Sequence, residues 1–353
     1  MMREGLTFDD VLMIPSYNGF TSRGDKGIST AVDLSNYKVP LYLNDALSIP
    51  IISANMDTIT GSEMASKMGE LGGLGILHRF MSIEENVQEY IKATDSHPTK
   101  RTLVGCSIGA SDKTGANLER FLKLYEVGAR IFCVDVAHGH SKVAGNMVKE
   151  IKALGHQDVF IIAGNVCTYA GADYLIGCGA DMIKVGIGPG SACTTRIKTG
   201  FGYPQLSAIM DCARCSRPII ADGGIKTPGD AAKALAAGAK MVMIGGLLAG
   251  TDETPNFAKN EDGNVLFRGM ASREANESFY GKMDSWKTAE GVSTNVQAKG
   301  SAELVIADLM GGIRSAMTYV GAENLTTFAQ RTEFVRVTNA SVYENSAHIL
   351  NRN

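Results

Sequence analysis

The chain has 353 residues, of which 44% are hydrophobic and 20% charged, and its formal net charge at pH 7 is −3. This composition is typical of a folded globular protein. The net charge provides no broad basic surface of the kind that proteins use to bind nucleic acid or a membrane. No apolar run reaches the roughly 18–20 residues of a transmembrane helix, and the first ten residues lack a signal-peptide core. The seven irregularly spaced cysteines favour free thiols and a cytoplasmic location over a disulfide framework.

Eight short apolar runs recur along the chain and predict strands buried on both faces of a parallel sheet. In chain order they cover residues 50–53, 75–78, 102–105, 131–135, 159–163, 182–186, 218–222 and 241–245. Helical patterns lie between them, for example at 84–93, 117–127, 143–153, 170–176, 206–213 and 229–237. Eight such strand–helix units predict an α/β fold of the closed (β/α)8 TIM-barrel type, with an open doubly wound sheet as the alternative. Three helices lead into a Gly-Ala pair, at Gly128, Gly179 and Gly238, which fits a left-handed cap at the helix end.

Two segments lie outside the repeat. Residues 1–49 are expected to form an N-terminal extension that packs on the barrel. Residues 251–300 are polar and weakly periodic, which is typical of a functional flap or of disorder. No low-complexity tract or proline-rich linker divides residues 1–353, so the sequence predicts a single domain.

The active site of such a barrel forms at the carboxyl ends of the strands. Gly223-Gly224 and Gly245-Gly246 follow the last two runs, where backbone N–H groups of this fold commonly bind phosphate. The alternative is that these glycines only form tight turns.

The loop at residues 186–196 is rich in glycine and presents Cys193 between hydroxyl side chains. A cysteine in a polar loop near Arg196 can be held partly as thiolate, which is the nucleophilic form. The alternative is a buried and inert thiol. Cys212 and Cys215 have metal or redox spacing, and His138 and His140 are two residues apart, but neither pair brings the four ligands of a zinc site.

Several motifs together resemble the IMP dehydrogenase/GMP reductase family. They lie at residues 6–11, 53–58, 186–196, 222–224, 268–270 and 311–315, and the likeness spans nearly the whole chain. The resemblance implies a tetrameric barrel in which Cys193 attacks C2 of the purine ring of a nucleoside monophosphate. A nicotinamide then exchanges hydride at the same carbon.

The two branches of this family differ in the flap and in a regulatory CBS pair. The stretch from His78 to Thr102 has no room for CBS domains, which are therefore not expected. Dehydrogenases have an Arg and a Tyr that activate the hydrolytic water where this chain has Asn295 and Ala298, and neither can act as a base. Residues 198–205, 315–322 and 331–337 are also closer to the reductase pattern, whereas residues 6–11 and 135–141 and Lys287 leave a dehydrogenase without CBS domains as the alternative.

The reaction implied for the reductase branch is GMP + NADPH + H⁺ → IMP + NADP⁺ + NH₃. Cys193 would form a thioimidate at C2, while Thr195 and Glu290 would relay the proton that lets the amine leave. Asp222 would accept hydrogen bonds from the ribose hydroxyls. The remaining substrate positions implied are Ser191, Gly223, Gly224, Gly245 and Gly246 around the phosphate and Gly269, Met270, Ala271, Lys287 and Gly291 around the base.

The same resemblance implies the cofactor positions, a monovalent cation such as K⁺ and a homotetramer. The cofactor positions are Ser22, Arg23, Arg79, Asp135, Val136, Ala137, Gly188, Ser315 and Thr318. Arg23 and Arg79 would bind the 2′-phosphate that distinguishes NADPH, because Arg binds phosphate in a bidentate manner. The cation site would consist of Gly188, Gly190 and Cys193.

Two other classes of protein share parts of this pattern. A flavin-dependent barrel oxidoreductase would use the same glycines for phosphate but would have no use for Cys193, and the purified protein would be yellow. A nucleotide-binding sensor without catalysis would keep the glycines and would show no turnover.

Overall fold

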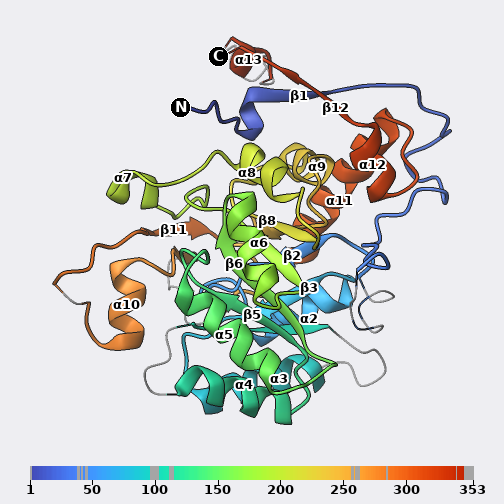
Figure 1. Cartoon of the computed structure of the whole chain (residues 1–353). Helices are drawn as coiled ribbons and strands as arrows, with labels where there is room; N and C mark the ends of the chain where they lie inside the picture. The colour runs from blue at the N-terminus through green and yellow to red at the C-terminus, as the bar shows by residue number, and fades with distance from the viewer. Residues whose placement is uncertain are drawn as a thin grey trace.

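The eight predicted strands close into one parallel barrel in a computed structural model of the protein (Figure 1). The structure describes residues 2–37, 40, 43, 47–95, 103–110, 115–255, 258, 263–283, 285–338 and 340–345. The strands pair in chain order, and the last pairs with the first. Their bounds are β2 (Ile51–Ser53), β3 (Leu74–Leu77), β4 (Val104–Ile108), β5 (Ile131–Asp135), β6 (Phe160–Val166), β7 (Met182–Val185), β8 (Ile219–Asp222) and β9 (Met241–Ile244).

Helices follow the strands and cover the outside of the barrel (Figure 1). They are α2 (Ser62–Glu70), α3 (Ile83–Asp95), α4 (Ala116–Glu126), α5 (Lys142–Ala153), α6 (Tyr169–Gly177), α8 (Gln205–Cys212), α9 (Pro228–Ala236) and α11 (Ala302–Tyr319). The predicted left-handed glycines are confirmed, with φ values of 105° at Gly128, 112° at Gly179 and 109° at Gly238. The (β/α)8 fold predicted from the sequence is therefore confirmed.

Two strands continue past their predicted ends, since β6 reaches Val166 where the predicted run stops at residue 163, and β4 shows the physical reason most clearly. The sequence pattern ends the run at residues 102–105 on a glycine, but β4 continues to Ile108, and Thr102 lies outside the described residues. Gly105 is an interior residue of β4, where a Cβ atom would lie 3.2 Å from Ile76 Cγ1 and 3.3 Å from Ile131 Cγ2. The glycine therefore marks close packing inside the barrel wall rather than the end of the strand.

The barrel strands alternate between two hydrophobic layers. Cys133, Met182 and Ile220 belong to the cluster that fills the barrel, while their neighbours along each strand pack outward against the helices. Because side chains on a strand alternate with a period of two, the next inward positions are Asp135, Lys184 and Asp222. Polar side chains thus form the last layer of the filling, at the carboxyl ends of the strands.

The other elements extend the barrel at its two ends and along one side. They are η1 (Phe8–Asp10), β1 (Val11–Ile14), α7 (Thr195–Thr199), β10 (Asn264–Arg268), α10 (Arg273–Tyr280), β11 (Ser293–Gln297), α12 (Leu325–Arg331), β12 (Glu333–Arg336) and α13 (Ser341–Glu344). In Figure 1, α7, α10 and β11 lie to the left of the barrel, and β1 pairs with β12 at the top.

Described residues of the N-terminal segment pack on the barrel. Val32, Leu34 and Leu47 join the cluster that fills the barrel, and the Lys233 ammonium of α9 donates to the Phe8 carbonyl at 2.8 Å. Within the described residues, no helix combines the length and hydropathy needed to cross a bilayer.

Glycine packing offers a test of the barrel wall. A Cβ atom on Gly75 of β3 would lie 2.4 Å from Ala65 Cα, a backbone atom of α2 that cannot rotate away. We expect Gly75→Ala to lower the free energy of unfolding by about 1–3 kcal/mol, the usual cost of overpacking. Gly177→Ala is the matched control, because nothing lies within 4 Å of the added atom. Urea unfolding that shows equal stability for both variants would contradict this packing.

Candidate active site

The predicted nucleophile lies in the loop between β7 and α7. Cys193 is half-buried, and its Sγ lies 3.2 Å from Thr195 Oγ1. The Thr195 hydroxyl in turn donates to Glu290 Oε2 at 2.8 Å. The structure therefore brings the three predicted catalytic side chains into one hydrogen-bonded chain, although Glu290 lies 95 residues beyond Thr195.

Backbone pairing holds the Glu290 segment against the cysteine loop. Gly291 forms an antiparallel bridge with Cys193, and the amide of Thr194 donates to the Glu290 carbonyl at 2.9 Å. On the other side, the Glu290 amide donates to the Ala271 carbonyl at 3.0 Å. A Cβ atom on Gly291 would lie 3.0 Å from the amide nitrogen of Ser272, so a larger residue would push this segment away from its neighbours.

A buried ion pair anchors the flap to the barrel. Arg268, at the end of β10, donates from Nε to Asp57 Oδ2 at 2.9 Å and also contacts this oxygen through Nη2. The two side chains are only 9% and 5% exposed. The Asp57 amide also lies 3.3 Å from the sulfur of Met270, one of the predicted base-contacting residues. The described residues of the segment expected to be a flap or disordered include the β10–β11 hairpin and α10.

The predicted phosphate-binding residues converge at the ends of β7, β8 and β9. A Cβ atom on Gly246 would lie 2.8 Å from Ser191 Oγ, and one on Gly223 would lie 3.1 Å from the Gly190 amide nitrogen. Gly223 and Gly224 have φ values of 90° and 80°, which L side chains rarely adopt. Glycines at these positions let the backbones approach closely, as loops that bind an anion through their N–H groups require.

Asp222 and Asp135 are joined by a lysine that the sequence analysis did not select. Lys184 Nζ lies 2.7 Å from Asp222 Oδ2 and 2.9 Å from Asp135 Oδ1. Asn165 donates to Asp222 Oδ2 at 2.9 Å, and Asn55 donates to Asp135 Oδ2 at 2.7 Å. The sequence signal was a lysine inside an apolar strand, where a charge is tolerated only with partners.

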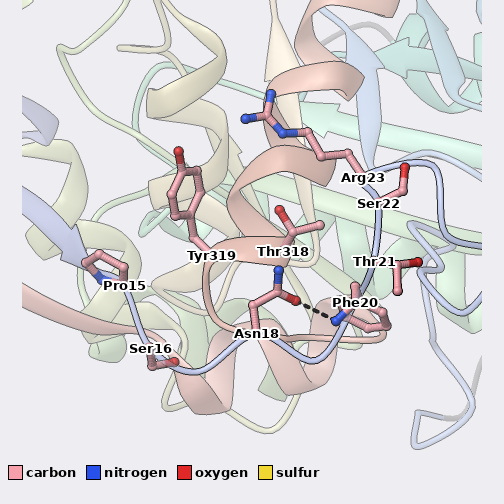
Figure 2. A pocket seen from close by; sticks show the side chains of 9 residues that line it. All are labelled: Pro15, Ser16, Asn18, Phe20, Thr21, Ser22, Arg23, Thr318 and Tyr319. Carbon is pink, nitrogen blue, oxygen red and sulfur yellow. Dashed lines mark hydrogen bonds between the residues drawn. The ribbon is translucent and has the colours of Figure 1, made fainter.

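Three of the predicted cofactor residues line one pocket of about 330 Å³ (Figure 2). Ser22 and Arg23 come from the N-terminal extension, and Thr318 comes from α11. Ser315 lies one turn before Thr318, and the Thr318 hydroxyl donates a hydrogen bond to the backbone carbonyl of Ser315 at 2.6 Å. The Arg314 guanidinium holds the extension to α11 by donating to the Arg23 carbonyl at 3.2 Å.

The other predicted cofactor residues lie at strand ends. Arg79 stacks 4.6 Å from the centre of the Phe80 ring. Asp135 ends β5, Val136 follows it with its amide bonded to the Gly164 carbonyl at 3.0 Å, and Ala137 is exposed. Among the described residues, no hydrogen bond or ion pair joins this group to the pocket at Arg23.

Arg196, which the sequence places near Cys193, donates from Nη2 to the Tyr203 carbonyl at 2.9 Å. A Cβ atom on Gly188 would lie 2.8 Å from Arg196 Cγ, so the aliphatic part of Arg196 packs against this glycine. The side-chain hydrogen bond of Cys193 Sγ is with Thr195. Lys287 is exposed, and its ammonium lies 5.1 Å from the centre of the Trp286 ring.

The remaining thiols and histidines form no metal centre in the part of the chain that the structure describes, where no group of three or more His, Cys, Asp and Glu side chains converges. The rings of His138 and His140 are 6.3 Å apart. Burial raises the pKa of Cys212 and of Cys215, so both favour the protonated thiol over the thiolate that binds metals.

Comparison with known proteins assigns the family. The sequence matches the family described as "IMP dehydrogenase / GMP reductase domain" over residues 5–348. The chain belongs to this family. It is therefore an oxidoreductase of purine nucleotide metabolism, and the resemblance predicted from its motifs is confirmed.

Relatives from both branches of the IMP dehydrogenase/GMP reductase family are similar to the chain. GMP reductase 2 of Mus musculus is 40% identical, with 94% of each chain covered. A crystal structure of inosine 5′-monophosphate dehydrogenase from Legionella pneumophila is 49% identical, with a TM-score of 0.80 and coverage of 96% of this chain and 99% of that one. A crystal structure of a GMP reductase variant from Trypanosoma brucei in complex with guanosine 5′-monophosphate is 31% identical, with a TM-score of 0.85 and 98% of each chain covered.

His78, at the carboxyl end of β3, makes the free energy of unfolding of the protein dependent on pH. Burial lowers its pKa to about 4, and Arg120 and Arg268 act in the same direction, while Asp57 and Glu89 oppose them. Between pH 6.5 and 4 the unfolded chain therefore binds more protons than the folded one, so stability falls as the pH is lowered through this window. We expect a loss of about 2–3 kcal/mol between about pH 7 and about pH 4.5 from this group.

Urea unfolding at the two pH values tests this prediction. His78→Asn is expected to lose less stability on acidification than the parent chain, and the exposed His140→Asn serves as the control. The same pH dependence in the parent and His78→Asn would contradict the role assigned to His78.

Proposed function

We propose that the chain is a GMP reductase that converts GMP to IMP and ammonia with NADPH through a covalent bond to Cys193. The observation that carries the proposal is the position of the Thr195 hydroxyl between Cys193 and Glu290, at 3.2 Å and 2.8 Å. A hydroxyl so placed can pass a proton between the carboxyl group and a group bound at the sulfur, because it both donates and accepts.

The proton relay fits the departure of an amine. As Cys193 Sγ bonds to C2 of GMP, the bond from C2 to the 2-amino nitrogen must break, and this nitrogen leaves as ammonia once it is protonated. Glu290 supplies the proton through the Thr195 hydroxyl, and the thioimidate remains on Cys193. NADPH supplies the hydride that replaces sulfur at C2, which releases IMP and restores the Cys193 thiolate.

The surrounding residues fit a nucleoside monophosphate and a phosphorylated cofactor. Ser191 Oγ and the Gly246 backbone lie together where a phosphate would bind. Gly269, Met270 and Ala271 lie beside the Glu290 segment, where the base would lie. Arg23 at the 330 Å³ pocket is suited to a phosphate of NADPH, because guanidinium binds phosphate in a bidentate manner.

The cysteine loop also fits a monovalent cation. Gly188 and Gly190 offer carbonyl oxygens, the hard ligands that K⁺ prefers, and the Gly190 carbonyl already accepts the Cys193 amide at 3.0 Å. In the same loop the Thr194 hydroxyl is buried and has no partner among the described residues. The cation and the homotetramer remain predictions from the resemblance, and the cytoplasmic location remains a prediction from the cysteine pattern.

The flap favours the reductase over the dehydrogenase. Asn295 lies exposed in β11, and the exposed Ala298 follows the end of that strand. Neither side chain can take a proton from water, so hydrolysis of a covalent adduct would lack its base. The alternative is an IMP dehydrogenase without CBS domains, which the 49% identity with the Legionella structure favours.

Variants of the relay test the mechanism. Cys193→Ala is expected to abolish turnover while GMP still binds, because the phosphate and ribose contacts remain. Glu290→Gln is expected to slow amine release by about 10²-fold or more in single-turnover experiments. Glu274→Gln is the matched control, because Glu274 is a carboxylate near the flap that accepts the Ser293 hydroxyl at 2.9 Å without contacting Cys193. Turnover by Cys193→Ala would refute covalent catalysis.

The direction of the reaction separates the two branches. With GMP and NADPH we expect steady loss of absorbance in the reduced-nicotinamide band and formation of IMP. With IMP and NAD⁺ we expect little XMP, because an absent general base slows hydrolysis by about 10²–10⁴-fold. Products are separated by chromatography at saturating substrate, and efficient multiple-turnover formation of XMP would move the chain to the dehydrogenase branch.

A further inference from the structure

Lys184 is the most deeply buried charged group at the carboxyl end of the barrel. Its side chain is 4% exposed, and it occupies the inward position that follows Met182 on β7. The side chain therefore packs against the apolar side chains that fill the barrel, and Cys133 of β5 is one of its neighbours. A lone ammonium in such a place would carry a large desolvation cost, so its partners decide whether it is stable.

Its partners come from two strands on different sides of β7. Asp222 ends β8, the strand next to β7, whereas Asp135 ends β5, which is separated from β7 by β6. Lys184 Nζ lies 2.7 Å from Asp222 Oδ2 and 2.9 Å from Asp135 Oδ1. One ammonium thus fixes the distance between two carboxylates that belong to separate βα loops.

The two carboxylates differ in which of their oxygen atoms already accept hydrogen bonds from the protein. Asp222 accepts both Lys184 and Asn165 on Oδ2, so Oδ1 has no hydrogen bond to any residue that the structure describes. Asp135 accepts Lys184 on Oδ1 and Asn55 on Oδ2. Both side chains are partly exposed, at 20% and 26%, on the side away from the filling.

We propose that Lys184 is a positioning residue shared by the two nucleotides, because its ammonium holds the substrate-binding Asp222 and the cofactor-binding Asp135 in one fixed arrangement. The proposal rests on the proposed function and on the positions that the family resemblance implies, with Asp222 at the substrate ribose and Asp135 at the cofactor. When each carboxylate accepts ribose hydroxyls, the two riboses take a fixed position relative to each other. Such fixing of two reactants lowers the entropic part of the barrier to transfer between them.

The groups around Asp135 predict how the loss of Lys184 changes the protonation of that carboxylate. Burial alone would raise the pKa of Asp135, but Lys184, Asn55 and Arg79 together lower it. In Lys184→Met the remaining burial and the nearby Asp222 favour protonation of Asp135. A protonated carboxyl loses acceptor capacity for ribose hydroxyls, so binding should weaken as the pH falls.

Binding measurements without turnover test the proposal. We expect Lys184→Met to raise the dissociation constant of IMP, and that of NADP⁺ in the presence of IMP, each by about tenfold or more. The dissociation constant of NADP⁺ should rise further between about pH 8 and about pH 6 in this variant and stay nearly constant in the parent chain. Lys184→Arg, which keeps the charge, should restore most of both affinities.

Lys152→Met is the matched control. Lys152 of α5 pairs with Asp181, just before β7, at 2.8 Å and is 33% exposed, so it is a lysine–aspartate pair at the other end of the strand from the site. It is expected to lower the melting temperature and to leave both dissociation constants within about twofold. If Lys184→Met does not fold, Lys184→Gln takes its place, with the same joint loss of affinity expected.

Two outcomes would overturn the proposal. One is a Lys184→Met or Lys184→Gln protein that binds both nucleotides as tightly as the parent chain. The other is a loss of affinity that Lys152→Met shows equally, since that would reflect stability alone. A parent chain that binds no purine nucleoside monophosphate would instead contradict the proposed function, so the two failures are distinguishable.

Discussion

The hydrogen bond from Thr195 to Glu290 is the contact on which the proposed chemistry depends. It joins two parts of the chain that lie far apart in sequence, since Thr195 begins α7 at the rim of the barrel and Glu290 precedes β11 of the flap hairpin. The bond alone is too weak to hold a flap. It is supported by backbone pairing of Gly291 with Cys193 and by the buried pair of Arg268 with Asp57. In the proposed mechanism the flap is thereby part of the active site rather than a cover over it.

The barrel end combines this relay with a layer of buried charge. One ammonium, Lys184, faces the carboxylates of Asp135 and Asp222, so the layer has a net negative charge. Asn55 and Asn165 add hydrogen bonds to the same carboxylates without changing that charge. Ionised carboxylates only accept, which suits recognition of ribose hydroxyls and would repel a phosphate. The phosphate groups are accordingly expected at the glycine loops instead.

Much of the fold could be predicted from the sequence because strands buried on both faces leave a strong apolar signal. Each run then placed its following loop at the same end of the barrel, which predicted that the cysteine loop would meet the loops of Gly223 and Gly246, as its residues Gly190 and Ser191 do. The contacts of Lys184 could not be predicted, because they depend on which inward positions of β5, β7 and β8 lie at equal height in the barrel. The hydrogen bond of the Arg196 guanidinium to the Tyr203 carbonyl could not be predicted either, because it depends on the path of the loop after Cys193.

Departure of the 2-amino group through Cys193 is the central claim, and isotope exchange tests it without any hydride transfer. The protein is incubated with GMP, NADP⁺ and ¹⁵N-labelled ammonium, and the GMP is analysed by mass spectrometry. Reversible formation of the thioimidate predicts ¹⁵N in the 2-amino group of GMP, at a rate that falls by about 10²-fold in Glu290→Gln and to zero in Cys193→Ala. Recovery of unlabelled GMP from a protein that demonstrably binds it would contradict the claim.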